Sequence, residues 1–198
     1  MYEVEMKVRA SGDAVRSRLR DVGGSLSGVV FQEDTYYDAP HREFAETDEA
    51  LRVRREADLG EDAPLGVDAV MDALDDGAFD ARVTYKGPLV DDTSKTREEF
   101  ETGVADGATM ARVLESLGFA PAATVAKRRE RWTLDGVTVT VDDVADVGAF
   151  VEVETETEES GVAAARERVA DALRALDLDP DEQIRTSYLG LLLGDGEE

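Results

Sequence analysis

Residues 2–9 read Tyr-Glu-Val-Glu-Met-Lys-Val-Arg, a stretch in which apolar and charged side chains alternate. Successive side chains of a β-strand point to opposite faces, so the alternation predicts a strand with two chemically different faces. One face carries Val4, Met6 and Val8, and the other carries Glu3, Glu5, Lys7 and Arg9.

The same period-two alternation recurs along the chain and predicts eight strands. They lie at roughly residues 2–9, 31–38, 50–56, 81–87, 97–104, 124–132, 137–143 and 149–156. Helical spacing predicts four helices, at roughly residues 11–22, 106–117, 160–176 and 181–193. Residues 58–80 are acidic and punctuated by Gly and Pro, so we expect a partly flexible insertion with one short helix near 67–74. The pattern indicates one α+β domain over residues 1–198.

Nearly every predicted strand has one charged face of mixed sign. The solvated side of a half-exposed sheet would explain any one of these faces. However, most of the basic residues lie on these strands, including three of the four lysines, Lys7, Lys86 and Lys127. A closed antiparallel barrel explains the pattern if the charged faces line its lumen and the apolar faces point outward to the helices.

The chain is strongly acidic, with 46 Asp and Glu against 22 Lys and Arg and a net charge of −24. Such a surface repels nucleic acid and anionic membranes. With so few lysines, it is typical of adaptation to molar intracellular salt. The chain has no cysteine, which excludes disulfides and thiolate chemistry. It shows no signal peptide and no apolar run long enough to cross a bilayer, so we expect a cytoplasmic protein.

The predicted lumen suits a triphosphate. Arginine offers a planar fork that matches phosphate oxygens, and lysine offers a compact charge. Carboxylates in the same lumen would repel the substrate unless they held a divalent metal, and oxygen ligands suit Mg²⁺ or Mn²⁺. Glu3 with Glu5, and Glu152 with Glu154, are two carboxylate pairs at i,i+2 spacing. Metal-assisted phosphoryl or nucleotidyl transfer is the chemistry that follows.

Other kinds of catalytic site find little support. The chain has no GxxxxGK[ST] phosphate loop, no GxSxG elbow and no HExxH helix. Its single histidine, His41, lies in a Pro-His-Arg loop, where we expect no catalytic role.

Several motifs follow one another in the order typical of one family. They are Glu3-Val4-Glu5-Met6-Lys7, Gln32-Glu33-Asp34-Thr35-Tyr36-Tyr37-Asp38, Leu51-Arg52-Val53-Arg54, Thr84-Tyr85-Lys86-Gly87-Pro88, Arg97-Glu98-Glu99-Phe100-Glu101, Lys127-Arg128-Arg129, Val141-Asp142-Asp143, Phe150-Val151-Glu152-Val153-Glu154 and Arg185-Thr186-Ser187-Tyr188. On these motifs the chain resembles the CYTH superfamily, the triphosphate tunnel metalloenzymes. That superfamily includes class IV adenylyl cyclases and thiamine- or inorganic triphosphatases.

The resemblance implies an eight-stranded antiparallel tunnel that holds Mg²⁺ or Mn²⁺ and a triphosphate. The metal ligands that it implies are Glu3, Glu5, Asp142, Glu152 and Glu154. The cations implied for the triphosphate are Lys7, Arg52, Arg54, Lys86, Arg97, Lys127 and Arg129. The expected catalytic residues are Glu3, Glu5, Lys7, Lys86 and Lys127.

The layout looks most like class IV adenylyl cyclases, which convert ATP to cyclic AMP and pyrophosphate. Some of these enzymes carry a His-Phe pair upstream of the first strand, and no such pair precedes Tyr2. A triphosphatase acting on tripolyphosphate, thiamine triphosphate or a nucleoside triphosphate is therefore the alternative. A module that binds polyphosphate or nucleotide without turnover is a third hypothesis, but it has no need of two metal-binding carboxylate pairs. The resemblance also implies that the protein can form a homodimer.

Overall fold

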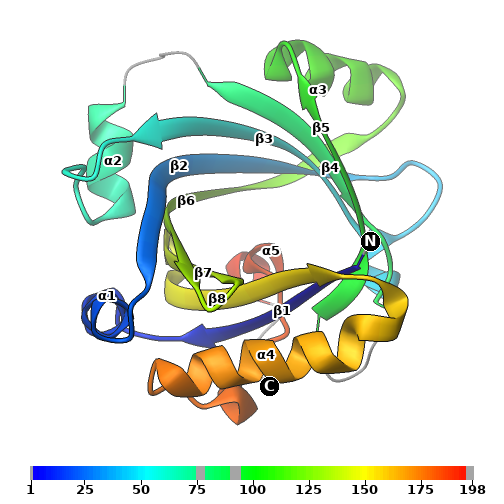
Figure 1. Ribbon diagram of the computed structural model, residues 1–198. Helices are drawn as coiled ribbons and strands as arrows, with labels where there is room; N and C mark the ends of the chain where they lie inside the picture. Colours follow the sequence, from blue (N-terminus) through cyan, green and yellow to red (C-terminus); the bar gives the residue numbers. More distant parts are fainter. Residues whose placement is uncertain (1, 75–78, 90–94, 195–198) are drawn as a thin grey trace.

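The computed structural model describes residues 2–74, 79–89 and 95–194, with residues 95 and 96 described by their backbone alone. The described residues form eight strands and five α-helices (Figure 1). The strands are β1 (Tyr2–Arg9), β2 (Ser25–Asp38), β3 (Ala50–Leu59), β4 (Asp80–Lys86), β5 (Lys95–Val104), β6 (Ala120–Leu134), β7 (Val137–Val144) and β8 (Gly148–Thr157).

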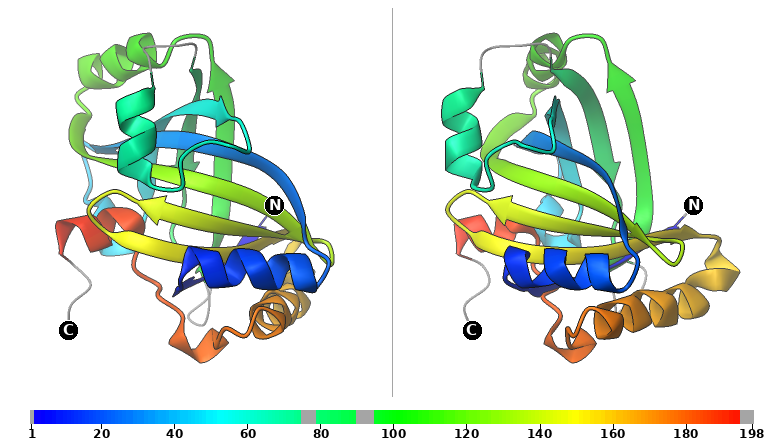
Figure 2. Two further views of the ribbon diagram at one scale, coloured as in Figure 1. Left: turned by 90° about the vertical axis from the view of Figure 1, so that its left-hand side faces the viewer. Right: turned by 60° about the vertical axis from the view of Figure 1, so that its left-hand side comes forward.

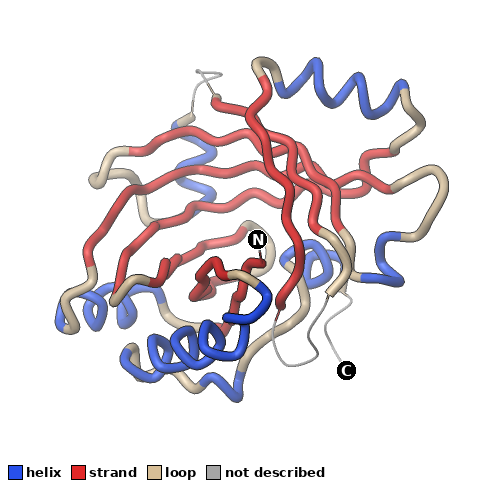
Figure 3. The backbone as a smooth tube through the Cα atoms, turned by 45° about the vertical axis from the view of Figure 1, so that its right-hand side comes forward, coloured by secondary structure: helices blue, strands red, loops and turns tan. Residues whose placement is uncertain are grey.

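The strands close into a barrel in the order β1-β5-β4-β3-β2-β6-β7-β8, with β8 paired back to β1. Every neighbouring pair is antiparallel. Figure 3 shows the strands curving around the middle of the molecule. Closure gives each strand a paired neighbour on both sides, although β1 and β5 pair over only part of their length, and it brings the first and last strands side by side. The predicted closed eight-stranded antiparallel barrel is confirmed.

Two strands are longer than the sequence predicts, because β2 and β6 pair with each other over almost their whole length. Ser25 pairs with Thr133 at one end of the ladder, and Asp38 pairs with Ala120 at the other. The Gly- and Ser-rich start of β2 is typical of a turn. A register shift between Leu26 and Gly28 allows it to continue in the ladder instead.

The helices α1 (Gly12–Asp21) and α4 (Val162–Ala175) pack on one side of the barrel, against β1, β7 and β8. The helices α2 (Val67–Ala73) and α3 (Gly107–Ser116) lie on other parts of its surface (Figure 2). The short helix expected within residues 58–80 is thus α2, while residues 75–78 of that segment lie outside the described residues. Within the described ranges, no helix combines the length and the hydropathy needed to span a membrane.

The helix predicted over residues 181–193 is wrong in its first half. The structure has a 3₁₀ turn at Pro180–Glu182 and a short helix, α5 (Tyr188–Leu193). Between them the chain runs along β1, where the backbone N–H of Ile184 donates to the carbonyl of Lys7 at 2.7 Å. Ser187 then caps α5, its Oγ accepting from the N–H of Gly190 at 3.0 Å. This contact with a distant strand replaces the helical hydrogen bonds that local spacing indicates.

The apolar faces of the strands point outward, as predicted. Val4 and Val153 are fully buried on the outer face of β1 and β8, where they pack in one cluster with Leu19 of α1 and Leu173 of α4. This outer core carries the hydrophobic stabilisation that an aliphatic lumen would otherwise supply. The lumen is therefore free to hold polar side chains.

We expect Leu173→Ala to lower the free energy of unfolding by about 2–5 kcal/mol, because it leaves a cavity in the outer core. Leu117→Ala is the matched control, because Leu117 is 66% exposed on the outside of the molecule. We expect that control to change stability by less than about 0.5 kcal/mol. Chemical denaturation followed by the fluorescence of the single tryptophan, Trp132, measures both. Equal losses in the two variants would contradict a core built between helices and barrel.

Candidate active site

A polar cavity of about 940 Å³ occupies the barrel. Of the twelve residues assigned to the site from the sequence, it is lined by all but Asp142: Glu3, Glu5, Lys7, Arg52, Arg54, Lys86, Arg97, Lys127, Arg129, Glu152 and Glu154. They come from six of the eight strands, so only closure of the barrel brings them together. The cavity has an acidic side on β1 and β8 and a basic side on β3, β4 and β6.

Three glutamates meet on the acidic side. Antiparallel pairing of β1 with β8 places Glu5 opposite Glu154, and Lys7 opposite Glu152. Carboxylate oxygens of Glu5, Glu152 and Glu154 all lie within 4.8 Å of one another. Such a cluster of hard oxygen donors on neighbouring strands fits a divalent cation of the Mg²⁺ or Mn²⁺ type.

The three carboxylates differ in protonation. Burial opposes ionisation of Glu152, but Arg129 and Lys7 hold its pKa well below the usual range. Burial, reinforced by the negative charge of Glu3, raises the pKa of Glu154 to about 8. Burial and the charge of Glu152 also raise the pKa of Glu5. Without a metal, the group therefore holds protons that a bound cation would displace.

Glu3 lies beside this group and is paired with a cation. Its Oε1 is 3.0 Å from the Nζ of Lys86, which also lies 2.7 Å from a carboxylate oxygen of Glu99. Although burial opposes the charged form, Glu3 and Glu99 raise the pKa of Lys86. The structure therefore places Glu3 in an ion pair across β1, β5 and β4, next to the three-glutamate group.

Asp142 lies in another ion pair, on β7. The Nε of Arg129 donates to its Oδ1 at 2.7 Å, and an Nη2–H of Arg129 donates to its Oδ2 at 2.5 Å. The hydroxyl of Tyr188 also donates to Oδ2, at 2.8 Å. Asp142 thus holds Arg129 in a two-point grip, and Arg129 in turn contacts Glu152. Asp142 therefore pairs directly with a cation and is not part of the three-glutamate cluster.

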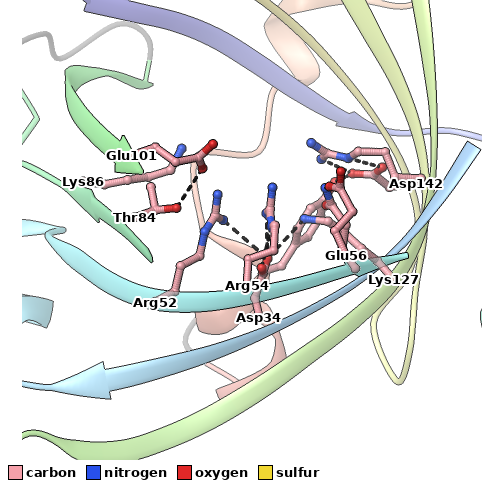
Figure 4. A network of polar contacts seen from close by, with 12 residues as sticks. Asp34, Arg52, Arg54, Glu56, Thr84, Lys86, Glu101, Lys127 and Asp142 are labelled. Atoms are coloured by element: carbon pink, nitrogen blue, oxygen red, sulfur yellow. Dashed lines mark hydrogen bonds and ion pairs between the residues drawn. The ribbon is translucent and has the colours of Figure 1, made fainter. Parts of the chain in front are cut away.

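Asp34 on β2 organises the basic side, a role that the sequence reasoning missed (Figure 4). It is fully buried and accepts from the Nε and Nη2 of Arg54 at 2.6 and 2.8 Å. Arg52 lies 3.4 Å and Lys127 lies 3.6 Å from its Oδ2. Burial opposes ionisation, but Arg52 and Arg54 hold the pKa of Asp34 well below its usual range. The alternation of side chains along β2 places Asp34 on the same face as Gln32, and this was the sequence feature that could have indicated its role.

Lys127 differs from Lys86, because its surroundings favour the neutral form of the amine. Burial, reinforced by the charge of Arg129, lowers the pKa of Lys127 to about 7. Its Nζ lies 5.1 Å from the ring centre of Tyr188, and the Nζ of Lys7 lies 4.3 Å from the same ring. Tyr188 of α5 therefore meets both lysines, a contact that strand parity alone does not reveal.

Arg97 lies toward the loop that joins β2 to β3. It is buried, and its Nη2 lies 2.6 Å from a carboxylate oxygen of Asp48. Its Nη1 also donates to the backbone carbonyl of Asp48. These contacts hold Arg97 on the wall of the cavity.

Comparisons with known proteins agree with this geometry. Residues 1–188 match the model of the CYTH domain family. A protein of Methanocaldococcus jannaschii named "Putative adenylate cyclase MJ0240" is 35% identical over 193 residues, which cover 96% of this chain and 98% of that protein.

Two solved structures extend the comparison. The PH1819 protein of Pyrococcus horikoshii has a TM-score of 0.82 and 34% identity, over 98% of this chain and 99% of that one. The HpAC1 protein of Hippeastrum shares the fold, with a TM-score of 0.61 and 14% identity over 100% of this chain and 97% of that one. The family model and the Methanocaldococcus relative both cover nearly the whole chain. This chain belongs to the CYTH domain family.

Proposed function

We propose that this protein is a metal-dependent enzyme that binds a triphosphate in its barrel and converts ATP to cyclic AMP and pyrophosphate. One observation carries the proposal: three clustered carboxylates face a wall of buried cations inside a single cavity. Carboxylates beside a phosphate site need a cation between them and the substrate, and this arrangement provides a place for both. The name of the Methanocaldococcus relative, at 35% identity, favours the cyclase reaction.

The basic side binds the triphosphate. Arg52, Arg54 and Lys127 are kept in place by Asp34, so their free donors point in fixed directions before substrate arrives. Preorganised donors stabilise developing phosphate charge without reorganisation, and positioning with charge neutralisation is most of the catalysis in phosphoryl transfer. In a cyclase, these cations would hold the triphosphate of ATP so that the ribose 3′-hydroxyl faces the α-phosphorus.

The acidic side holds the metal, Mg²⁺ or Mn²⁺. Glu5, Glu152 and Glu154 are the proposed ligands, and the bound cation would neutralise phosphate charge and make an attacking hydroxyl more acidic. Glu3 and Asp142 remain proposed ligands, but each would first have to leave its cation, Lys86 or Arg129. Lys127, with a pKa of about 7, can exchange a proton at neutral pH and is the proposed proton-transfer group.

A triphosphatase is the second candidate. HpAC1 of Hippeastrum is described as having a dominant triphosphatase activity, although at 14% identity its likeness to this chain extends to the fold alone. The same cation wall would hold a triphosphate for attack by water on a terminal phosphorus. A binding module without turnover is less consistent with three carboxylates gathered in one cavity.

We propose that the enzyme is cytoplasmic. We also propose that it does not bind nucleic acid, because a surface with a net charge of −24 repels a nucleic-acid backbone. Homodimer formation stays part of the proposal on the strength of the family resemblance.

Incubation with ATP and Mg²⁺ or Mn²⁺ in molar salt tests the reaction. We expect cyclic AMP and pyrophosphate in equal amounts, whereas orthophosphate as the main product would establish the triphosphatase instead.

We expect Glu5→Gln and Glu154→Gln to lower turnover by about a hundredfold or more. The metal stabilises the transition state by several kcal/mol, and each ~1.4 kcal/mol lost slows the reaction about tenfold. The control is Glu33→Gln, since Glu33 pairs with Arg55 at 3.0 Å outside the lumen. Undiminished turnover in both lumen variants would refute the metal assignment.

Metal affinity should rise with pH. The raised pKa of Glu154, about 8, means that this carboxyl is protonated at pH 7, and a metal must displace its proton. We therefore expect Mn²⁺ affinity, measured by calorimetry, to increase up to about tenfold per pH unit below pH 8 and to level off above it. Glu154→Gln should weaken binding and flatten this dependence, whereas Glu33→Gln should leave it unchanged. A wild-type affinity for Mn²⁺ that stays constant from about pH 6 to about pH 9 would contradict the assignment of Glu154 as a metal ligand.

A further inference from the structure

The row of cations in the barrel does not stop at the residues assigned to the triphosphate. On β6, the side chain two residues after Arg129 on the same face is Arg131, and on β4 Arg82 lies directly opposite Arg54 of β3. Both Arg82 and Arg131 line the same cavity as the triphosphate cations. From Lys127 to Arg131 the basic row of β6 extends for about 13 Å, since a strand rises about 3.3 Å per residue.

These two arginines are open to solvent, unlike the inner ones. The side chains of Arg82 and Arg131 are 36% and 35% exposed, against 8% for Arg54 and 9% for Arg129. Arg82 also lines a second hollow of about 470 Å³, formed by the start of β4 and the end of β5. A ligand could therefore reach Arg82 from this hollow as well as from the cavity.

The two arginines are also held more loosely than Arg54 and Arg129. Both contact one carboxylate, Glu56 of β3: Nη2 of Arg131 lies 2.6 Å from its Oε2, and Nη2 of Arg82 lies 3.7 Å from its Oε1. Arg82 makes a second single contact, donating to Glu101 at 3.0 Å. Among the described residues, no carboxylate grips either arginine at two points, as aspartates grip Arg54 and Arg129. Each guanidinium has five N–H donors, so both retain donors for a phosphate.

Glu56 supplies the negative charge that lies between the two arginines. It is buried and accepts from Nε2 of Gln32 at 2.5 Å as well as from Arg131. Burial opposes ionisation, but hydrogen bonds from Arg131 and Gln32 lower the pKa of Glu56. The cluster thus contains a charged acceptor between two partly exposed arginines, and an amide N–H of Gln32 donates to the same position.

We propose that Arg82 and Arg131 form a second phosphate site, beyond the triphosphate, in which a phosphate group replaces Glu56 between the two guanidinium groups. The inference rests on the proposed function, because it takes the cavity to hold a triphosphate on its inner cations. The phosphate group belongs either to a polyphosphate chain of four or more units or to a free pyrophosphate ion. Both sources present the same oxygens to the arginine forks.

Calorimetry in the presence of Ca²⁺, an oxygen-ligated cation that takes the place of Mg²⁺ or Mn²⁺ on the carboxylates and slows turnover, tests the site with defined probes. We expect tetrapolyphosphate to bind the wild-type protein about fivefold to tenfold more tightly than tripolyphosphate, the gain from one further arginine-bound phosphate. In the double variant Arg82→Ala with Arg131→Ala, tripolyphosphate should bind within about twofold of wild type and the gain should disappear. The control is Arg55→Ala, because Arg55 lies on the same strand as Arg54, is 43% exposed and pairs with Glu33 on the outer face.

A second variant covers the case in which the double variant does not fold. Glu56→Gln keeps the shape of the side chain but removes its charge, so it should release both arginines. We expect this variant to increase the preference for tetrapolyphosphate over tripolyphosphate. An unchanged or smaller preference would count against replacement of Glu56.

A third titration distinguishes the two sources of the phosphate group. If pyrophosphate binds protein already saturated with tripolyphosphate, and the double variant loses this binding, the site takes a free ion. Equal binding of three and four phosphates, with no pyrophosphate bound to the saturated protein, would overturn the inference alone. A gain that survives in the double variant would overturn it as well. Failure of the wild-type protein to bind tripolyphosphate would overturn the proposed function and, with it, this inference.

Discussion

Asp34 and its three cations are the contact on which the interior of this barrel depends. Arg52, Arg54 and Lys127 converge on one fully buried carboxylate, with Arg54 held at two points. Cations taken out of water at such short range repel one another, and the cost of burying them is large unless a charge of opposite sign is present. Asp142 on β7 does the same for Arg129 of the neighbouring strand β6. Two aspartates therefore allow the barrel to close around a basic wall.

A polar lumen shifts the source of stability to the outside. Because the inner faces of the strands carry charges, the apolar side chains that fold the protein lie on the outer faces, beneath α1 and α4. The helices are thus part of the core. The same arrangement explains how the chain can be strongly acidic overall and still concentrate its few lysines around one cavity. Asp34 and Asp142 pair with lumen arginines. The carboxylates of Glu5, Glu152 and Glu154 lie close enough together to hold a metal.

Strand parity predicted most of this from the sequence. The alternation of Glu3, Glu5 and Lys7 with Val4 and Met6 indicated both the lumen and the outer core, and the structure confirms the barrel. The pairing of individual charges was not predictable in the same way. Asp34 meets Lys127 because β2 lies beside β6, and Glu5 meets Glu154 because β8 closes onto β1; alternation does not contain that strand order. Tyr188 enters the cavity through a short C-terminal helix, and helical spacing overestimated that helix because the preceding residues run along β1.

We propose that Asp34 and Asp142 organise the cations of the lumen and that Glu5, Glu152 and Glu154 hold the metal. The most direct test is anomalous diffraction from crystals grown with Mn²⁺ and an ATP analogue that cannot react. We expect a manganese peak about 2.2 Å from oxygens of Glu5, Glu152 and Glu154, with phosphate oxygens bound to Arg52 and Arg54. Asp34 should still hold Arg54, and Asp142 should still hold Arg129. A peak coordinated by Asp142 away from the three glutamates, or phosphates bound outside the barrel, would contradict it.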